Sequence, residues 1–466
     1  MWYNSTIMKV QFFTLGCKVN TYETEAMKQQ LLSAGYELTD KVADIYIVNT
    51  CSVTNIAERK SRQMLRRAKE LNPNAVIIAC GCYSQVAKEE IEKMPEVDII
   101  LGVNEKNKIV DIIKEYEGKK DLEVSDVMNQ SEFLDFGPTT YTELNRAIIK
   151  VQDGCDRFCS YCIIPYARGR VRSRKPDSIL KEIEEISKEG IKEVVITGIH
   201  LASYGKDFKN PEEYREKYGY NREYVKFNSN DDLHTGGFRL IELLEQINKI
   251  KGIERIRLGS LEPKLITKDF IERLSKLEKI CPHFHLSLQS GCNKTLIAMN
   301  RRYKTEEFEE IVNLLRKTYI DVMLTTDIIV GFPGETDEDF ESTYKFLEKI
   351  KFYKMHIFKY SPKKGTVAEK MVNQVDGSKK EERSKRLLNL SDKYQNMYNE
   401  ENLGKNLKVL IEEKENGYLK GHTSNYIMCK IKSEDESYID KIIEIVGIEN
   451  DKETKEIIGK IVKINN

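Results

Sequence analysis

Three cysteines in one short segment carry the clearest chemical signal in the sequence. Cys155, Cys159 and Cys162 form a C-x-x-x-C-x-x-C triplet within Val151–Arg174, VQDGCDRFCSYCIIPYARGRVRSR, and Tyr161 precedes the last cysteine. Three thiolates in one loop suit an iron–sulfur cluster, because each iron corner takes one soft sulfur ligand. A cuboidal 4Fe-4S cluster held by three cysteines keeps one iron free to bind a substrate or cofactor.

A structural zinc knuckle is the alternative for this triplet. Zinc sites of that kind take four ligands, usually as two C-x-x-C pairs. No second pair follows the triplet. The spacing therefore favours an iron–sulfur cluster.

The composition bounds the class of protein. A chain of 466 residues is long enough for two to four domains. Charged residues make up 32% of the chain but sum to zero, so any polyanionic partner must be recognised by local patches. We find no secretion signal or membrane span, and Met8 could be the start instead of Met1. Ten cysteines in such a chain indicate metal ligation in the reducing cytoplasm, without membrane association.

Residues 8–136 alternate short apolar runs with amphipathic segments. We expect buried strands at KVQFF, DIYIVN, AVIIAC and VDIILG, and helices at Thr21–Ala34, Asn55–Leu71, Gln85–Met94 and Asn107–Tyr116. This β-α repeat predicts a doubly wound parallel sheet. Residues 117–140 lose the periodicity and are expected to form a linker.

A cysteine follows each of the first three expected strands, at Cys17, Cys51 and Cys82. Any one of them alone is more often a buried core residue. The carboxyl ends of parallel strands meet at one edge of a sheet, so we expect the three to converge there. We interpret them as ligands of a second iron–sulfur cluster with an open iron. Cys80 competes with Cys82 but is expected to point into the core.

The helix after Cys51 carries several basic residues. A solvated helix face and a phosphate-binding patch are equally good interpretations. The candidates for RNA contact in this helix are Arg59, Arg62, Arg66 and Arg67.

Residues 141–375 contain six further β-α units. We expect strands at Arg146–Val151, EVVITG, RIRLGS, HFHLSL, VMLTTDIIVG and MHIFKY, and helices at Ser178–Lys188, Leu240–Ile250, Lys268–Leu277, Thr305–Lys317 and Asp337–Lys349. Six units give an open, partial (β/α)6 barrel. Lys206–Gly237 has no clear period and is expected to be a long surface insertion.

Polar residues recur where these strands end, and α/β barrels place their sites at such ends. The polar positions are Thr197, His200, Ser260, Glu262, Ser287, Gln289 and Asp327. The turn GFPGE, which begins at Gly331, is a plausible wall for an adenine ring. Contacts to a bound cofactor are expected from Tyr161, Gly198, Ser287, Gln289, Asp327 and Gly331.

The last part is expected to be a charged helical connector, 376–401, followed by a small barrel, 402–466. Alternating apolar and polar residues with glycine turns predict five short antiparallel strands. Small barrels of this kind often bind RNA, and Lys420, His422 and Tyr426 are the candidates here. A merely structural cap is the alternative.

The order of these features resembles the methylthiotransferase family of radical S-adenosylmethionine (SAM) enzymes over nearly the whole chain. The segments most similar to the branch that acts on N6-threonylcarbamoyladenosine beside the tRNA anticodon are TLGCKVNTYETEA, NTCSVTN, GCYSQ, IIPYARGRVRSR, GIHLASYG, HLSLQSGC and GHTSNY. Two features depart from the family pattern. They are the length of the insertion and Lys359, which stands where a proline is usual before Tyr360-Ser361.

The resemblance implies two 4Fe-4S clusters, a C-terminal TRAM barrel and two SAM molecules per turnover. It also implies the tRNA anticodon stem-loop as partner and an external low-potential electron donor, with no obligate protein partner. Activating a C–H bond at carbon 2 of adenine requires radical chemistry, which a cofactor supplies. We hypothesise that the Cys155 cluster cleaves SAM, and that the Cys17 cluster holds the sulfur that is added.

Three alternatives stay open. Isopentenyladenosine in tRNA or a ribosomal-protein aspartate could be the substrate. The first domain could merely store electrons. The protein could also be a non-catalytic, metal-containing RNA-binding protein.

Overall fold

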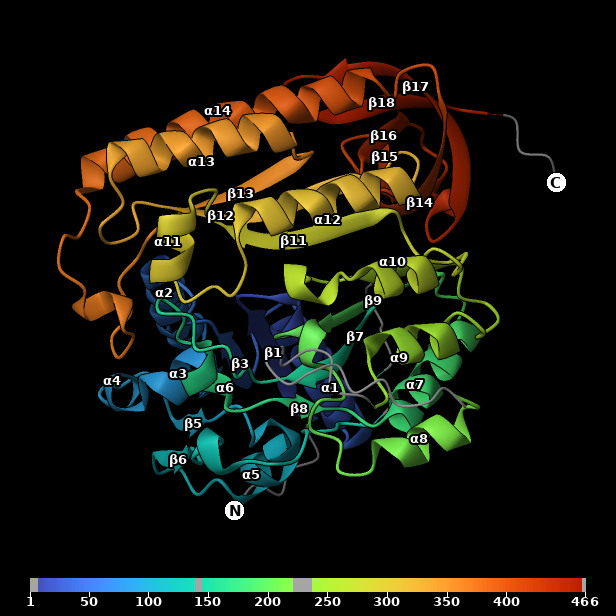
Figure 1. The fold of residues 1–466 in the computed structure, drawn as a ribbon. Coiled ribbons are helices and arrows are strands. Elements are labelled where there is room, and N and C mark those ends of the chain that lie inside the picture. Colours follow the sequence, from blue (N-terminus) through green and yellow to red (C-terminus); the bar gives the residue numbers. More distant parts are fainter. Residues whose placement is uncertain (1–6, 138, 140–144, 221–236, 463–466) are drawn as a thin grey trace.

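The computed structural model describes residues 7–137, 139, 145–220 and 237–462 (Figure 1). Met1, Pro138, the expected boundary at 141 and the segment 221–236 of the insertion lie outside the described residues. No helix in the described part of the chain combines the length and the apolar character that crossing a membrane requires.

The first region is a parallel sheet with helices on both faces. Its elements are β1 (Lys9–Thr14), α1 (Lys18–Ser33), β2 (Glu37–Leu38), β3 (Ile45–Thr50), α2 (Asn55–Leu71), β4 (Val76–Gly81), α3 (Cys82–Val86), α4 (Lys88–Glu92), β5 (Ile99–Leu101), α5 (Ile109–Glu115) and β6 (Asp121–Glu123). The strand order is β2-β1-β3-β4-β5-β6, and each neighbouring pair is parallel. This confirms the predicted doubly wound sheet and adds two short edge strands.

The strands of this sheet are apolar on both faces because both faces are covered. On one face, Val48 packs in a core cluster with Leu65 and Ala68 of α2. On the other, Ile47 packs with Met27 and Leu31 of α1. The helix predicted at Gln85–Met94 was wrong in its bounds. The chain forms α3 and α4 instead, because Ala87 leaves helical geometry with φ −131°.

The central region is a partial barrel of six parallel strands with helices outside. Its elements are β7 (Arg146–Asp153), α6 (Ile164–Arg168), β8 (Arg172–Ser173), α7 (Pro176–Lys188), β9 (Glu193–Gly198), α8 (Pro211–Lys217), α9 (Leu240–Ile247), β10 (Arg255–Leu258), α10 (Lys268–Leu274), β11 (His283–Gln289), α11 (Asn293–Ala298), α12 (Thr305–Thr318), β12 (Met323–Val330), α13 (Asp337–Ile350) and β13 (Lys354–Lys359).

The barrel strands form two sheets, β10-β9-β7-β8 and β11-β12-β13, with β8 as an unexpected antiparallel edge. Single parallel bridges, Ile256–Ile280 and Leu261–Leu286, join the two sheets. The core lies between the strands and the outer helices, so alternate strand residues face the barrel interior. In the insertion, α8 was not predicted. Tyr214 and Tyr218 order it by packing their rings on Phe238.

The last region is a long helix and a closed barrel. Its elements are α14 (Gly377–Glu400), β14 (Asn406–Glu415), β15 (Tyr418–Thr423), β16 (Met428–Lys432), β17 (Ile442–Asp451) and β18 (Glu456–Ile461). The helix α14 runs along α13 toward the barrel (Figure 1). The barrel closes in the order β14-β15-β16-β18-β17. The predicted five strands are confirmed, except that β16 and β18 pair in parallel.

Candidate iron–sulfur and cofactor site

The Cys155 loop leaves the end of β7 through a tight turn at Gly154. Gly154 has φ +69°, and a β-carbon there would lie 1.8 Å from the carbonyl oxygen of Arg170. Only glycine fits so close an approach of two backbone segments. The Cys155 amide then donates a hydrogen bond to the Gly169 carbonyl at 3.0 Å. The loop is therefore held at the carboxyl end of a barrel strand, where α/β barrels carry their sites.

The three thiols of this loop lie at the edge of the barrel interior. Cys155 is buried, whereas Cys159 and Cys162 are half-buried. The Arg157 amide donates to the Cys155 sulfur at 3.4 Å, and the Arg301 guanidinium donates to the Cys159 sulfur at 3.3 Å. N–H donors of this kind stabilise negative charge on sulfur. Sequence reasoning missed Arg301, which lies far from the loop in the chain.

The three thiols of this loop are suited to binding a positively charged metal centre. Burial, with a smaller contribution from the neighbouring Cys159, raises the pKa of the Cys155 thiol to about 12. Burial likewise raises the pKa of Cys162. Such thiols stay protonated at neutral pH unless a bound cation replaces the proton. A donor set of three thiols around one space is what an iron–sulfur cluster with an open iron requires.

The other three cysteines come from three separate loops of the first region. Cys17 precedes α1, Cys51 follows β3, and Cys82 begins α3. Gly16 has φ +101°, and a β-carbon there would lie 3.0 Å from the Cys51 sulfur. Burial raises the pKa of Cys51 to about 12, and the thiols of Cys82 and Cys17 add to the shift because they lie near. Cys80, in contrast, is fully buried in the core.

Arg168 connects the two groups of cysteines. Its Nε donates to the Cys82 sulfur at 3.4 Å. Its Nη1 donates to Glu23 on α1 at 2.7 Å and to Asp153 at 3.1 Å. Asp153 lies two residues before Cys155, so one guanidinium contacts both the Cys82 thiol and the end of the strand that carries the Cys155 loop.

Glu23 is the centre of this buried network. Its carboxylate also accepts from Lys106 at 2.5 Å and from Lys150 at 2.6 Å, and the Glu23 side chain and both lysines are fully buried. Burial alone would raise the pKa of Glu23, but Arg168, Lys106 and Lys150 outweigh it and hold the pKa well below its usual value. The network joins α1, the first sheet and β7. Sequence reasoning missed it, because its members are common charged residues far apart in the chain.

A second polar cluster lies beside the Cys155 loop. His200 Nε2 contacts Glu262 Oε2 at 2.7 Å, and Arg157 Nη2 donates to the same oxygen at 2.8 Å. Burial would raise the pKa of Glu262, but the hydrogen bond and charge of His200, with Arg157 and Arg301, lower it to about 2. The ends of β9 and β10 thus meet at the cysteine loop, as barrel topology predicts.

The residues expected to contact the cofactor lie in the cysteine loop and on or directly after β9, β11 and β12. The Tyr161 ring lies edge-on to Phe332, with centroids 6.5 Å apart, next to Gly331. Ser287 lies on β11, where its carbonyl accepts from Arg301 at 3.1 Å. The remaining three are Gly198 at the end of β9, Gln289 with φ +69° at the end of β11, and Asp327 on β12.

The candidate RNA-binding residues occupy two surfaces. On α2, Arg59, Arg66 and Arg67 are exposed, whereas Arg62 donates to Tyr83 Oη at 2.7 Å. In the C-terminal barrel, three candidates are engaged by neighbouring side chains. These contacts are Lys420 with Glu415 at 2.6 Å, His422 with Glu412 at 2.8 Å, and the Tyr426 ring stacked between His422 and His283.

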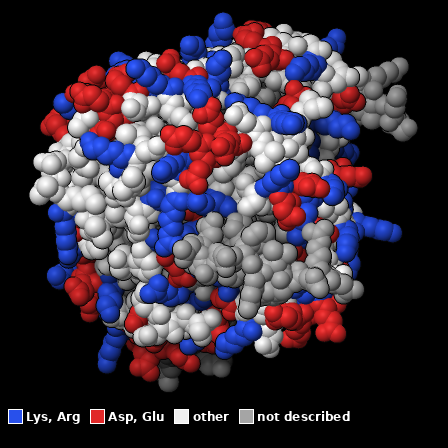
Figure 2. Space-filling model, viewed as in Figure 1, with Lys and Arg blue, Asp and Glu red and all other residues white. Residues whose placement is uncertain are grey.

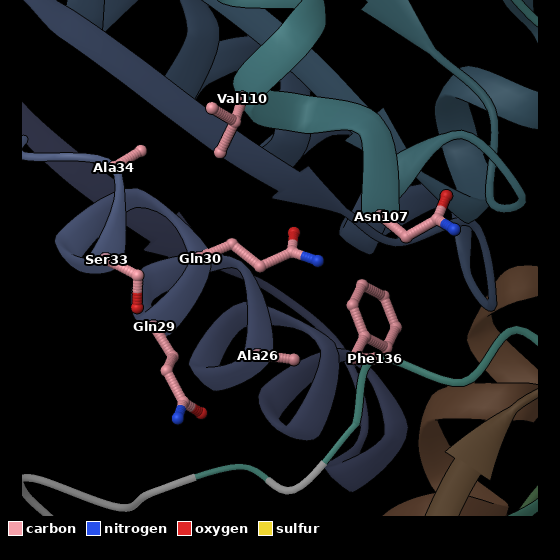
Figure 3. A pocket seen from close by; sticks show the side chains of 8 residues that line it. All are labelled: Ala26, Gln29, Gln30, Ser33, Ala34, Asn107, Val110 and Phe136. Carbon is pink, nitrogen blue, oxygen red and sulfur yellow. The ribbon is translucent and has the colours of Figure 1, made fainter.

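A surface hollow of about 420 Å³ lies elsewhere, between α1 and α5 (Figure 3). The residues lining it are Ala26, Gln29, Gln30, Ser33, Ala34, Asn107, Val110 and Phe136. None is a cysteine or an expected cofactor contact. On the face shown in Figure 2, basic and acidic side chains are interspersed. The cysteine groups therefore mark the functional site better than shape or surface charge does.

Two family models match the regions that carry the two groups of cysteines. The model of the radical SAM superfamily matches residues 149–347, and that of the uncharacterized protein family UPF0004 matches residues 9–102. The threonylcarbamoyladenosine tRNA methylthiotransferase MtaB of Bacillus subtilis (strain 168) is 38% identical over 465 residues, covering 98% of this chain and 93% of that protein.

Two further relatives match most of the chain. The MtaB protein of Aquifex aeolicus (strain VF5) is 39% identical over 443 residues, covering 94% of this chain and 100% of that protein. The tRNA-2-methylthio-N(6)-dimethylallyladenosine synthase of Caldicellulosiruptor saccharolyticus (strain ATCC 43494 / DSM 8903 / Tp8T 6331) is 36% identical over 433 residues, covering 91% of this chain and 86% of that protein. The chain therefore belongs to the methylthiotransferase family of radical SAM enzymes.

Proposed function

We propose that the protein is a tRNA-modifying enzyme that installs a methylthio group on carbon 2 of N6-threonylcarbamoyladenosine next to the anticodon. The names of the relatives at 38% and 39% identity support this substrate over dimethylallyladenosine, the substrate named for the relative at 36%. The observation that carries the proposed chemistry is the pair of three-thiol groups, with Arg168 between the Cys82 thiol and Asp153 at the start of the Cys155 loop.

Each group of cysteines is proposed to hold one 4Fe-4S cluster. Cys155, Cys159 and Cys162 would hold one, and Cys17, Cys51 and Cys82 the other. When bound, such clusters supply the electron that cleaves SAM and a site for the sulfur that is transferred. The electron itself is proposed to come from an external low-potential donor.

The protein's own residues orient these ligands. Arg301 holds the Cys159 sulfur and the Ser287 carbonyl together, so it fixes the cysteine loop against β11. Arg157 holds the loop against Glu262. The Arg157–Glu262 pair is buried and the Arg301 contacts are half-buried. Hydrogen bonds from guanidinium groups are charge-assisted, so both arginines restrain the position of the loop.

The cofactor and RNA contacts follow from this arrangement as proposals. SAM would be contacted by Tyr161, Gly198, Ser287, Gln289, Asp327 and Gly331. The tRNA anticodon stem-loop would be contacted by Arg59, Arg62, Arg66, Arg67, Lys420, His422 and Tyr426. The target adenine must leave the stack of the anticodon loop to reach the barrel interior. A tRNA substrate would be met in the cytoplasm, so the protein is proposed to act there.

Nucleoside mass spectrometry of tRNA from cells lacking the protein tests the proposal. We expect the 2-methylthio group to be lost from threonylcarbamoyladenosine while the isopentenyladenosine derivatives stay unchanged. Loss of the 2-methylthio group from the isopentenyladenosine derivatives instead would identify isopentenyladenosine as the substrate. Unchanged tRNA would refute a tRNA methylthiotransferase. Iron analysis of the anaerobic protein should find about eight irons per chain if both clusters are present.

A further inference from the structure

Three side chains of the barrel interior form a cluster that belongs to neither group of cysteines. His285, Asp327 and His356 each offer a ligand atom, and these atoms lie within 4.8 Å of one another. His285 Nε2 is 3.1 Å from Asp327 Oδ2. We propose that this cluster binds a divalent transition-metal ion, of the class of Zn²⁺ or Fe²⁺, independently of the iron–sulfur clusters.

The register of three neighbouring strands brings these residues together. His285 pairs with Thr325 between β11 and β12, and Asp327 pairs with His356 between β12 and β13. The strands are parallel, so residues of the same parity point to one face. The opposite face carries Phe284 and other core residues packed on the outer helices. The three ligand atoms therefore face the barrel interior.

The donor set suits a transition metal. Two imidazoles and one carboxylate bind Zn²⁺, Fe²⁺ and similar ions, and three ligands on one side leave further coordination positions open. His285 and Asp327 are half-buried and His356 is exposed, so an ion could enter from the barrel interior. Water or an oxygen of a bound molecule would complete the coordination.

A second layer of contacts fixes the orientation of one ligand. His285 Nδ1 lies 3.0 Å from the Thr325 hydroxyl, which also lies 3.1 Å from His283 Nε2. Because Nδ1 is occupied by Thr325, Nε2 remains for the metal. Metal-binding histidines typically have their other ring nitrogen held in this way.

The proposed metal site lies near the cysteine loop along β11. His285 precedes Ser287 by two residues, which is about 7 Å along a strand. Arg301 joins the Ser287 carbonyl to the Cys159 sulfur. A metal bound here would face the same interior as the Cys155 cluster. Asp327, expected among the cofactor contacts, would then act through this ion.

Zinc binding by the cluster-loaded protein tests the proposal. The protein, with both clusters reconstituted and unbound metal removed, is dialysed anaerobically against Zn²⁺, and zinc and iron are measured by mass spectrometry. We expect about one zinc per chain, at least tenfold less in His356→Ala and in Asp327→Asn, and unchanged iron in all three proteins. The matched control is His422→Gln. His422 contacts Glu412 at 2.8 Å, and no third ligand joins this pair among the described residues, so zinc should stay at one per chain.

X-ray absorption at the zinc edge separates this site from stray binding to thiols. Ligation by imidazole and carboxylate gives distances of about 2.0–2.1 Å, whereas ligation by sulfur gives about 2.3 Å. Nitrogen and oxygen ligands that disappear with His356→Ala would support the site. Sulfur ligation, or zinc retained by both His356→Ala and Asp327→Asn, would overturn it, as would a parent protein that binds no zinc.

Discussion

The two groups of cysteines are built in opposite ways. Cys155, Cys159 and Cys162 lie in one loop, whose shape is set by its own turn and by the backbone beside it. Cys17, Cys51 and Cys82 come from three loops, and only the parallel sheet brings them together. The first group is a local feature of the chain. The second is a property of the fold, so it should respond to changes in packing that leave the first group intact.

The Glu23 network is where the two groups depend on each other. It contains Glu23, Lys106, Lys150, Asp153 and Arg168, all buried and joined by short contacts. Burying charges is expensive unless each is paired. The pairing of Glu23 with three cations from the two regions therefore determines how the first region sits on the barrel.

Removing a ligand of the local group should have the largest effect. In Cys155→Ala, cleavage of SAM to 5′-deoxyadenosine is expected to fall to background, because the cluster loses one of three ligands. Methylthio product should disappear as well. Anaerobic assays with chromatography of 5′-deoxyadenosine measure this loss. Cys429→Ala, a buried cysteine of the C-terminal barrel, should keep full cleavage.

Removing a cysteine of the assembled group should separate SAM cleavage from methylthio transfer. In Cys17→Ala we expect SAM cleavage to persist while methylthio product is lost. Mass spectrometry of an anticodon stem-loop substrate, run beside the cleavage assay, measures both. A Cys17→Ala variant that still makes methylthio product would falsify the role of the second group.

Removing the central charge of the network should destabilise the protein. In Glu23→Gln, Asp153 is the one carboxylate of the network that remains for Lys106, Lys150 and Arg168. Because buried charges then lack a partner, we expect the unfolding free energy to fall by about 3–5 kcal/mol. Arg168→Met should cost less, because both lysines still pair with Glu23. Anaerobic urea titrations measure the free energies.

An exposed ion pair serves as the control for the network. Glu341 pairs with Arg386 at 2.6 Å, and the side chains of Arg386 and Glu341 are 38% and 43% exposed. Glu341→Gln should change the unfolding free energy far less than Glu23→Gln, because water already solvates that pair. Equal effects of the two substitutions would show that the Glu23 network does not hold the two regions together.

An effect smaller than that of Glu23→Gln is expected at the turn beside Cys17. Gly16→Ala places a β-carbon against the Cys51 side chain at φ +101°, with an expected cost of about 1–3 kcal/mol and partial loss of iron. Gly154→Ala meets the Arg170 backbone, which cannot move aside, so it should lose more iron. Iron per chain after reconstitution measures both. A greater loss of iron in Gly16→Ala than in Gly154→Ala would contradict this expectation.

The structure confirms most of the fold that the sequence predicts. Short apolar runs that alternate with amphipathic segments predict the parallel sheet and the partial barrel, and period-two alternation predicts the small C-terminal barrel. The errors lie where tertiary contacts act. The segment Gln85–Met94 is divided into two helices at Ala87, and α8 is ordered by rings that pack on Phe238. The parallel β16–β18 pair depends on how the barrel closes, which no local pattern encodes.

The sequence by itself determined the cysteine triplet and the succession of strands and helices along the chain, because spacing and periodicity are local properties. Only the tertiary structure decided which side chains surround the cysteines. Arg168 reaches Glu23 across 145 positions of the chain, and His285, Asp327 and His356 meet because their strands are neighbours in register. Contacts of this range leave no local pattern, since any arginine, histidine or aspartate in the chain could have made them.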